Sequence, residues 1–323
     1  MSSSLTIERS TTSPAVPSTP PSGGERVTLS MVLSRVTAPM VVKWGLLGAA
    51  LGGLFHNWLY VQHFQSSQHF ADWGHAYFVP LVSLYILWQR RDALARERVR
   101  TCWAGVAPML AGIAGYIFFV AGYYNHMAQG WCAILTLYGL LLLMLGPGVM
   151  RHAALPVAYL VFGVTISEQV MLQVTARLQM IASQGAYALL NMVGITTDIA
   201  GVTLTVFDSQ GNALPLNVAE ACSGMRQVIS FLALGAAVAL VACRHWWQRV
   251  ILVAMAPPVA ILINIVRVAV LGVVSLWNPG FSAGEAHTFI GTALLIPAFA
   301  LYMLIVWVLG RIVREEPEGG ASS

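Results

Sequence analysis

Charged side chains are scarce in this chain of 323 residues. Aspartate, glutamate, lysine and arginine make up 9%, and lysine occurs once, as Lys43. Hydrophobic residues account for 57%, with a mean hydropathy of +0.72. A soluble domain does not need so much apolar surface, so the composition predicts a polytopic membrane protein. The formal net charge of +4 is too small to indicate a nucleic-acid partner.

Cysteine is also rare, and its four positions match neither a disulfide framework nor the spacing of a metal site. We expect Cys102 and Cys243 at one membrane face, and Cys132 and Cys222 at the other. A disulfide between Cys132 and Cys222 is the bridge that this placement leaves open. The chain has no glycine-rich phosphate loop, and we expect neither a metal nor an organic cofactor.

Both ends of the chain lack apolar runs. Residues 1–30 are rich in serine, threonine, proline and glycine, which cannot bury a core, and they contain no apolar stretch of the kind found in a signal peptide. We predict a disordered cytoplasmic extension over residues 1–35, an integral membrane domain over residues 36–311 and a polar cytoplasmic tail over residues 312–323.

Apolar runs dominate the rest of the sequence and predict an all-α membrane fold with about eight transmembrane helices. The second and fifth runs are short for a hydrocarbon layer of about 30 Å, so we expect them to be tilted or to extend into their flanks. The eight runs cover residues 41–62, 76–89, 103–124, 131–150, 154–167, 227–243, 249–275 and 288–310.

The basic residues predict the orientation. With both termini inside, fourteen of the 17 lysine and arginine residues fall on one side, which the positive-inside rule identifies as cytoplasmic. The exceptions are Arg177, Arg226 and Arg267. Arg267 lies well into the seventh run, a rise of about 27 Å from its start, which takes this arginine close to the outer boundary.

The longest piece outside the runs lies between the fifth and the sixth. Residues 168–193 mix polar and apolar positions at helical spacing, which predicts an amphipathic helix at the outer surface. Residues 202–206 alternate with β-branched side chains, residues 208–212 have turn chemistry, and residues 213–218 are suited to return as a second strand. We therefore predict a small outer β-hairpin that delivers Cys222 to the membrane surface.

Cys222 is the candidate nucleophile. It stands in the stretch EACSGMR, residues 220–226, directly before the sixth run. At a helix N-terminus a thiolate is stabilised by the positive end of the helix dipole, and Arg226 would add to this effect. The polar neighbours Glu220, Ser223 and Arg226 favour this role over the alternative of a small buried side chain.

Arg267 is a charged residue inside an apolar run, where a charge is costly and marks a functional site by default. Asn264 lies on the same helical face. The expected role of Arg267 is to stabilise an oxyanion or to position a substrate carbonyl or carboxylate. The alternatives are an anchor at the outer interface and a structural partner for Glu220 or Glu285.

His287 directly precedes the eighth run, again on the outer side, and is the candidate general base. Alone it would be an ordinary loop histidine, but level with Cys222 and Arg267 it completes a cysteine acyl-transfer site. Other histidines follow the first run, in an outer loop with Asp72. Their spacing fits no common ligand pattern, so a solvated loop is preferred to a metal site. These are His63, His69 and His75, the last a candidate for lining a substrate groove.

These motifs resemble the exosortase/archaeosortase family of integral membrane cysteine transpeptidases over most of residues 41–310. The resemblance implies that Cys222, Arg267 and His287 are the catalytic residues. The most specific matches are EACSGMR at 220–226, NIVRV at 264–268 and His287 with Gly291; a weaker match is WGHAYFVP at 73–80, running into WQRR at 88–91.

The resemblance also implies a function. The expected enzyme is a thiol protease or transpeptidase of the bacterial inner membrane, with its active site on the periplasmic side. It would cleave exported proteins at a C-terminal sorting signal, through a cysteine thioester. The signal comprises a short Pro-Glu-Pro-like motif (PEP-CTERM), an apolar helix and a basic end. Such proteins, membrane lipid and a glycan or amine acceptor are the implied partners, in surface-protein sorting linked to exopolysaccharide.

Two other functions remain open on the residues alone. In a glycan ligase or lipid-linked sugar transferase, Arg267 and His287 would bind pyrophosphate and Cys222 would be incidental. In a transporter, Arg267 would be the substrate-binding charge. The transporter is less favoured because the sequence shows no inverted repeat and its polar groups gather at one face instead of the midplane.

Overall fold

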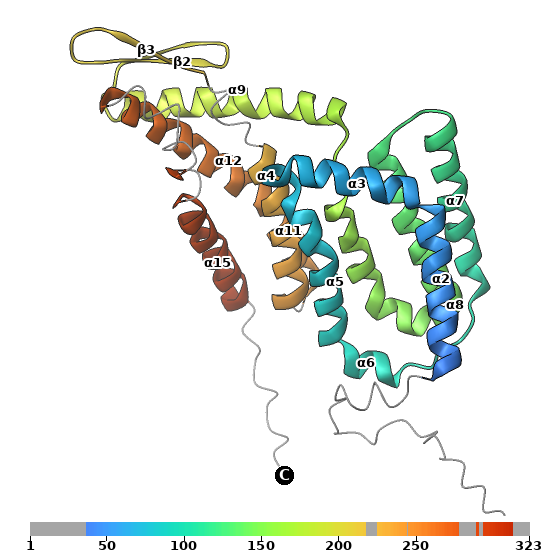
Figure 1. Ribbon diagram of the computed structural model, residues 1–323. Helices are drawn as coiled ribbons and strands as arrows, with labels where there is room; N and C mark the ends of the chain where they lie inside the picture. Colours follow the sequence, from blue (N-terminus) through green and yellow to red (C-terminus); the bar gives the residue numbers. More distant parts are fainter. Residues whose placement is uncertain (1–36, 218–224, 244, 278–288, 291–292, 313–323) are drawn as a thin grey trace, which may run out of the picture.

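The computed structural model describes residues 37–217, 225–243, 245–277, 289–290 and 293–312. These residues are mostly helical, with one small β-sheet at the upper end of the view in Figure 1. Three helices among them are long and apolar enough to cross a membrane, or up to four if one bent pair counts as one span. The structure is therefore consistent with a membrane protein, whereas the eight predicted spans are not confirmed. The three long helices are Trp103–Ala121, His126–Gly163 and Trp246–Trp277.

The first predicted span, residues 41–62, is not one straight helix. Helix α2 (Ala38–Leu54) ends at Phe55, and α3 (His56–Gln68) continues at an angle of 72° to it (Figure 1). Phe55 is buried with its ring edge-on to Tyr116, at a centroid distance of 4.6 Å. The residues of α3 are much more polar than those of α2, so a sequence window that averages the two segments misses the bend.

The expected outer loop around His63, His69 and His75 is also helical. After α3 come α4 (Phe70–Trp73) and the 3-10 helix η1 (Gly74–Tyr77). They lead into α5 (Phe78–Gln89) and α6 (Arg91–Arg96). The prediction of a loop was wrong because polar residues at helical spacing were assigned to solvent, although Gly74 and Ala76 pack in the interior.

Helices α7 (Val106–Ala121, after the 3-10 helix η2, Trp103–Gly105) and α8 (His126–Tyr159) form the most extensive helix pair. They approach closely because glycines lie at the contact: a Cβ on Gly139 would stand 2.3 Å from the backbone nitrogen of Met109. Within α8, Gly146 has φ 81° and ψ 173°, a conformation suited to glycine. This break replaces the predicted gap between residues 150 and 154, and η3 (Leu160–Gly163) ends the second half.

The predicted amphipathic helix and hairpin are both present. Helix α9 (Glu168–Met192) is followed by β1 (Thr197–Ala200), β2 (Thr203–Phe207) and β3 (Ala213–Asn217). All neighbouring strands are antiparallel, in the order β1-β2-β3. Asp208 closes the β2–β3 turn by accepting hydrogen bonds of 2.8 Å from the backbone nitrogens of Gln210 and Asn212. Strand β1, four residues long, was not predicted.

The last helices are α11 (Met225–Ala242), α12 (Trp246–Trp277) and α15 (Leu295–Ile312). Arg249 donates hydrogen bonds to the carbonyl oxygen of Cys243, which closes the α11–α12 connection. Further up, a Cβ on Gly235 would meet the Cβ of Ala256 at 3.2 Å. The two helices are therefore antiparallel neighbours, and α15 packs against α12 through a shared apolar cluster.

Helix α6 lies at the lower end of the molecule in Figure 1, and arginines of several elements meet around it. Arg90 donates to the carbonyl oxygen of His152, and Arg151 forms an ion pair with Glu97. Burial, and then the nearby charge of Arg249, lower the pKa of Arg90. The ends of α5 and α6, the lower turn of α8 and the start of α12 thus meet, as the clustering of arginines in the sequence predicts for a cytoplasmic end.

Candidate functional site

Of the three candidate catalytic residues, the structure describes Arg267 alone. Arg267 is half-buried on α12. Cys222 and His287 lie outside the described residues, as do Glu220 and Ser223. Arg226 belongs to the first turn of α11, but its side chain also lies outside the described part of the structure. The surroundings of the candidate site are therefore defined by Arg267 and by the described residues that follow Cys222 and His287 in the chain.

The register of α11 against α12 defines the level of Arg267. Near the lower end Cys243 meets Arg249, and midway Gly235 faces Ala256. Higher still, Ile261 packs against the cluster that contains Ile229. Each step up α12 is matched by a similar step back along α11. This register makes Arg267 level with the start of α11, which follows Cys222 in the chain.

The first described residue after Cys222 is anchored to the WGH motif of the sequence. Met225 is buried in one cluster with Trp73, Leu178 and Ile229. Trp73 comes from α4, so an element far away in the chain packs on the N-terminal turn of α11. The start of the weaker motif over residues 73–80 is thereby brought next to Met225, the sixth residue of the EACSGMR stretch.

The residues that follow His287 also approach α12. Ile290 packs against a cluster that contains Val268 and Leu271 of α12, together with Ala186 of α9 and Leu204 of β2. Val268 is the immediate neighbour of Arg267. Both flanks therefore end in apolar clusters that α12 shares: Ile290 reaches the cluster that contains Val268, beside Arg267, and Met225 lies in the cluster against which Ile261 packs.

Two buried amides lie close below Arg267. Asn264 on α12 is 3% exposed and Gln227 on α11 is 7% exposed. The oxygens Asn264 Oδ1 and Gln227 Oε1 have no hydrogen-bond partner among the described residues. The sequence pointed to Asn264 through its spacing from Arg267. It did not point to Gln227, because only the register of the two helices shows that Gln227 lies opposite Asn264.

His75 lies on η1, two residues after Trp73, and the two rings are 5.8 Å apart. Burial lowers the pKa of His75 below its ordinary value of 6.5, and the backbone carbonyls of Asp72 and Phe162 offset this in part. The imidazole is therefore neutral at pH 7. His75 lines neither of the two grooves described next, although its neighbours in the chain do.

A groove of about 460 Å³ with mixed polar and apolar walls opens beside Trp73. Its walls include Asp72, His126 and Glu168, together with Ile166 and Met171. Ile166 and Met171 also pack against the cluster that holds Met225. This polar groove therefore reaches the same corner of the molecule as the start of α11.

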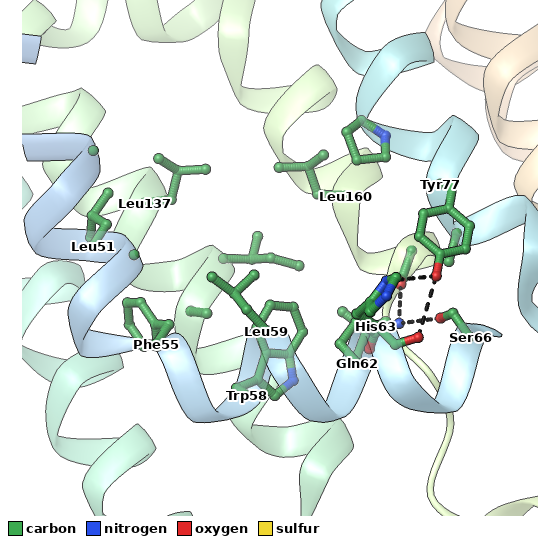
Figure 2. A pocket seen from close by; sticks show the side chains of 18 residues that line it. Leu51, Phe55, Trp58, Leu59, Gln62, His63, Ser66, Tyr77, Leu137 and Leu160 are labelled. Carbon is green, nitrogen blue, oxygen red and sulfur yellow. Dashed lines mark hydrogen bonds between the residues drawn. The ribbon is translucent and has the colours of Figure 1, made fainter. Parts of the chain in front are cut away.

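A second, apolar groove of about 580 Å³ runs between α2 and the rest of the bundle (Figure 2). Gly48 and Gly52 line it, and no atom lies within 4 Å of the positions that a Cβ would take there. Its polar end is shown in Figure 2. The hydroxyl oxygen of Tyr77 lies 2.9 Å from Nδ1 of His63, and Nε2 of Gln62 donates a hydrogen bond of 3.1 Å to the hydroxyl oxygen of Ser66. Apolar walls suit a hydrocarbon chain or an apolar helix.

Metal-ligand side chains do not converge within the described ranges: no group of three or more histidine, cysteine, aspartate or glutamate residues is placed to hold an ion. Three of the four cysteines, Cys102, Cys132 and Cys243, are free thiols. The sulfur of Cys132 lies against Gly115 of α7, whereas Cys222, its partner in the alternative disulfide, lies outside the described residues.

Apolar helices joined to a short sheet, with an arginine and two amides among them, define a helical membrane protein with polar residues gathered at one end. The family described as Transmembrane exosortase (Exosortase_EpsH) matches residues 66–308. The chain belongs to this family of transmembrane exosortases. No curated protein matches the chain, and no solved structure does.

Proposed function

We propose that this exosortase is a cysteine transpeptidase or protease that removes the C-terminal sorting signal of exported proteins. The observation that carries the proposal is the register of α12 against α11, which makes Arg267 level with the N-terminal turn of α11, where the EACSGMR stretch ends. Ile290, three residues after His287, packs against the cluster that contains Val268. These contacts support a site in which Cys222, Arg267 and His287 act together.

The reaction follows from the chemistry of these three groups. The thiolate of Cys222 attacks the carbonyl carbon of the scissile peptide, and the new C–S bond gives a tetrahedral oxyanion that Arg267 stabilises. The C–N bond then breaks as His287, protonated by the thiol, gives its proton to the departing amine. Water or an amine or sugar acceptor attacks the thioester, the C–S bond breaks and the thiol is restored.

Glu220, Ser223, Arg226 and Asn264 are proposed as supporting residues around this centre, and His75 as a substrate-binding residue. The neutral state of His75 at pH 7 suits a hydrogen bond to an uncharged peptide group. The burial of Trp73 against Met225 supports a role for the η1 region close to the nucleophile.

The proposed setting is the inner membrane of a bacterium, with both termini cytoplasmic and the site on the periplasmic side. Arginines around α6 and the lower turn of α8 support a cytoplasmic position for that end. We propose eight passes: α2, α5, α7, the two halves of α8 on either side of Gly146, α11, α12 and α15. The substrates would be exported proteins with PEP-CTERM-like signals, in surface sorting linked to exopolysaccharide.

The direct test is co-expression with a protein that carries a short Pro-Glu-Pro-like motif, an apolar helix and a basic end. Loss of the tail is followed by the size of the substrate on immunoblots. Cys222→Ala should abolish trimming, whereas Cys102→Ala and Cys132→Ala serve as matched controls that keep it. Continued trimming by Cys222→Ala would refute the proposal, and a glycan-transfer activity that Cys222→Ser keeps in full would favour the glycan-transferring enzyme instead.

A further inference from the structure

Gln227 and Asn264 form a pair of buried amides to which the reaction described above gives no bond-making or proton-transfer step. Both side chains are more than nine-tenths buried, at 7% and 3% exposure. The oxygen of each lacks a hydrogen-bond partner among the described residues. Buried polar atoms in proteins are nearly always paired, so two unpaired oxygens at one level of a helix pair need an explanation.

The two amides face the same space. Phe231 lies one helical turn below Gln227 on α11, and Ala260 lies one turn below Asn264 on α12. Phe231 and Ala260 are both buried members of the apolar cluster between α11, α12 and α15. Gln227 and Asn264 therefore stand directly above this cluster, on its side toward Arg267, as a polar floor beneath the candidate centre.

We propose that Gln227 and Asn264 bind one peptide group of the substrate backbone. A side-chain amide has a carbonyl oxygen that accepts and an NH2 group that donates, so a pair of amides complements the N–H and C=O of a peptide group. Both partners are neutral, which suits a site enclosed by apolar side chains better than a charged ligand does. This proposal rests on the proposed function, because it assumes that a polypeptide enters the site.

The substrate has a physical need for such partners. A peptide bond must leave the helical conformation to be attacked, and its backbone N–H and C=O groups then lose their helical hydrogen bonds. At membrane depth no water replaces them, and each unpaired group costs several kcal/mol. An amide pair one turn below Arg267 can take over these hydrogen bonds and hold the strand in extended form.

The test uses the full-length Cys222→Ala protein in nanodiscs, which binds without cleaving. The probe is a synthetic peptide with a Pro-Glu-Pro motif, an apolar helix and a basic end. Its affinity is measured before and after Gln227→Met and Asn264→Leu, which keep volume and remove hydrogen bonding. The control is Gln248→Met, a buried glutamine whose amide donates to the carbonyl oxygen of Leu309 near the other end of α12. Each site variant should weaken binding roughly tenfold or more, and the control should not.

A second measurement begins with a comparison that needs no substitution of Gln227 or Asn264. Peptides in which one backbone N–H at a time is replaced by an ester oxygen are bound to the protein with both amides intact. One position before the apolar helix should lose affinity roughly tenfold, and Asn264→Leu should remove that difference. If no ester and no variant changes the affinity, the amides enclose an internal water and the proposal is overturned.

These outcomes separate the two proposals. Cleavage by the Cys222→Ala protein, or failure of that protein to bind the peptide at all, counts against the proposed function. Tight binding that ignores both amides counts against this inference alone.

Discussion

Tyr302 on α15 donates a hydrogen bond of 2.7 Å to the backbone carbonyl oxygen of Leu252 on α12, and both residues are completely buried. The contact ties the last helix to the α11–α12 pair. In the chain, α15 comes shortly after the segment that contains His287, so this hydrogen bond fixes the helix that follows the segment.

We expect Tyr302→Phe to weaken the packing of α15 on α12. The substitution removes the hydroxyl donor to the Leu252 carbonyl oxygen in an apolar surrounding, which should lower the free energy of unfolding by about 0.5–1.5 kcal/mol. The measurement is thermal unfolding of the purified protein in detergent. An unchanged midpoint would show that the hydrogen bond does not contribute.

Gly235 allows Tyr302 to lie close to α11. A Cβ at this position would stand 2.3 Å from the Tyr302 hydroxyl oxygen, so Gly235→Ala must displace the ring and should cost about 1–3 kcal/mol. Gly310→Ala is the matched control, since no atom lies within 4 Å of its Cβ position and alanine is the better helix former. Equal effects of the two substitutions would contradict the packing described here.

Arg267→Lys tests whether a guanidinium is needed and not only a positive charge. A guanidinium presents several donors in a fixed plane, which an ammonium does not reproduce. We expect kcat for substrate cleavage to fall by about 10²–10³ and stability to change little. Arg177→Lys, on an exposed arginine of α9, is the control. An unchanged kcat in Arg267→Lys would show that Arg267 acts only through its positive charge.

His75 should make the protein less stable in weak acid. Burial lowers its pKa in the folded state below 6.5, so the unfolded chain binds the proton more readily. Its contribution to stability is complete above pH 6.5 and is lost as the pH falls below that value. His75→Gln should show a smaller drop in the unfolding midpoint between pH 7.5 and about pH 5.5. Identical pH profiles for the two proteins would disprove this assignment.

The elements with strong local signals are those that the sequence predicted well. The amphipathic spacing of residues 168–193 corresponds to α9, and the turn chemistry around Asp208 corresponds to the β2–β3 hairpin. The bend at Phe55 and the break at Gly146 were missed. Both depend on contacts with other helices, such as Phe55 on Tyr116, which a window along one segment cannot contain.

The residues of the candidate site also fall into those that the sequence predicted and one that it did not. Arg267 and Asn264 were predicted because a polar residue inside an apolar run is conspicuous by itself. Gln227 was missed because it stands at the start of a run, where a polar residue is ordinary. Gln227 becomes a candidate only in the structure, because the helix register sets it opposite Asn264. Its buried oxygen also has no hydrogen-bond partner among the described residues.

The most direct measurement of the central claim is intact-protein and peptide mass spectrometry of the enzyme, quenched with acid during a single turnover. We predict that the upstream part of the synthetic sorting-signal peptide becomes attached to Cys222 as a thioester that hydroxylamine releases. The adduct should be absent from Cys222→Ala and should accumulate when no acceptor amine is supplied. Cleavage without an adduct, or an adduct on any other residue, would contradict the account.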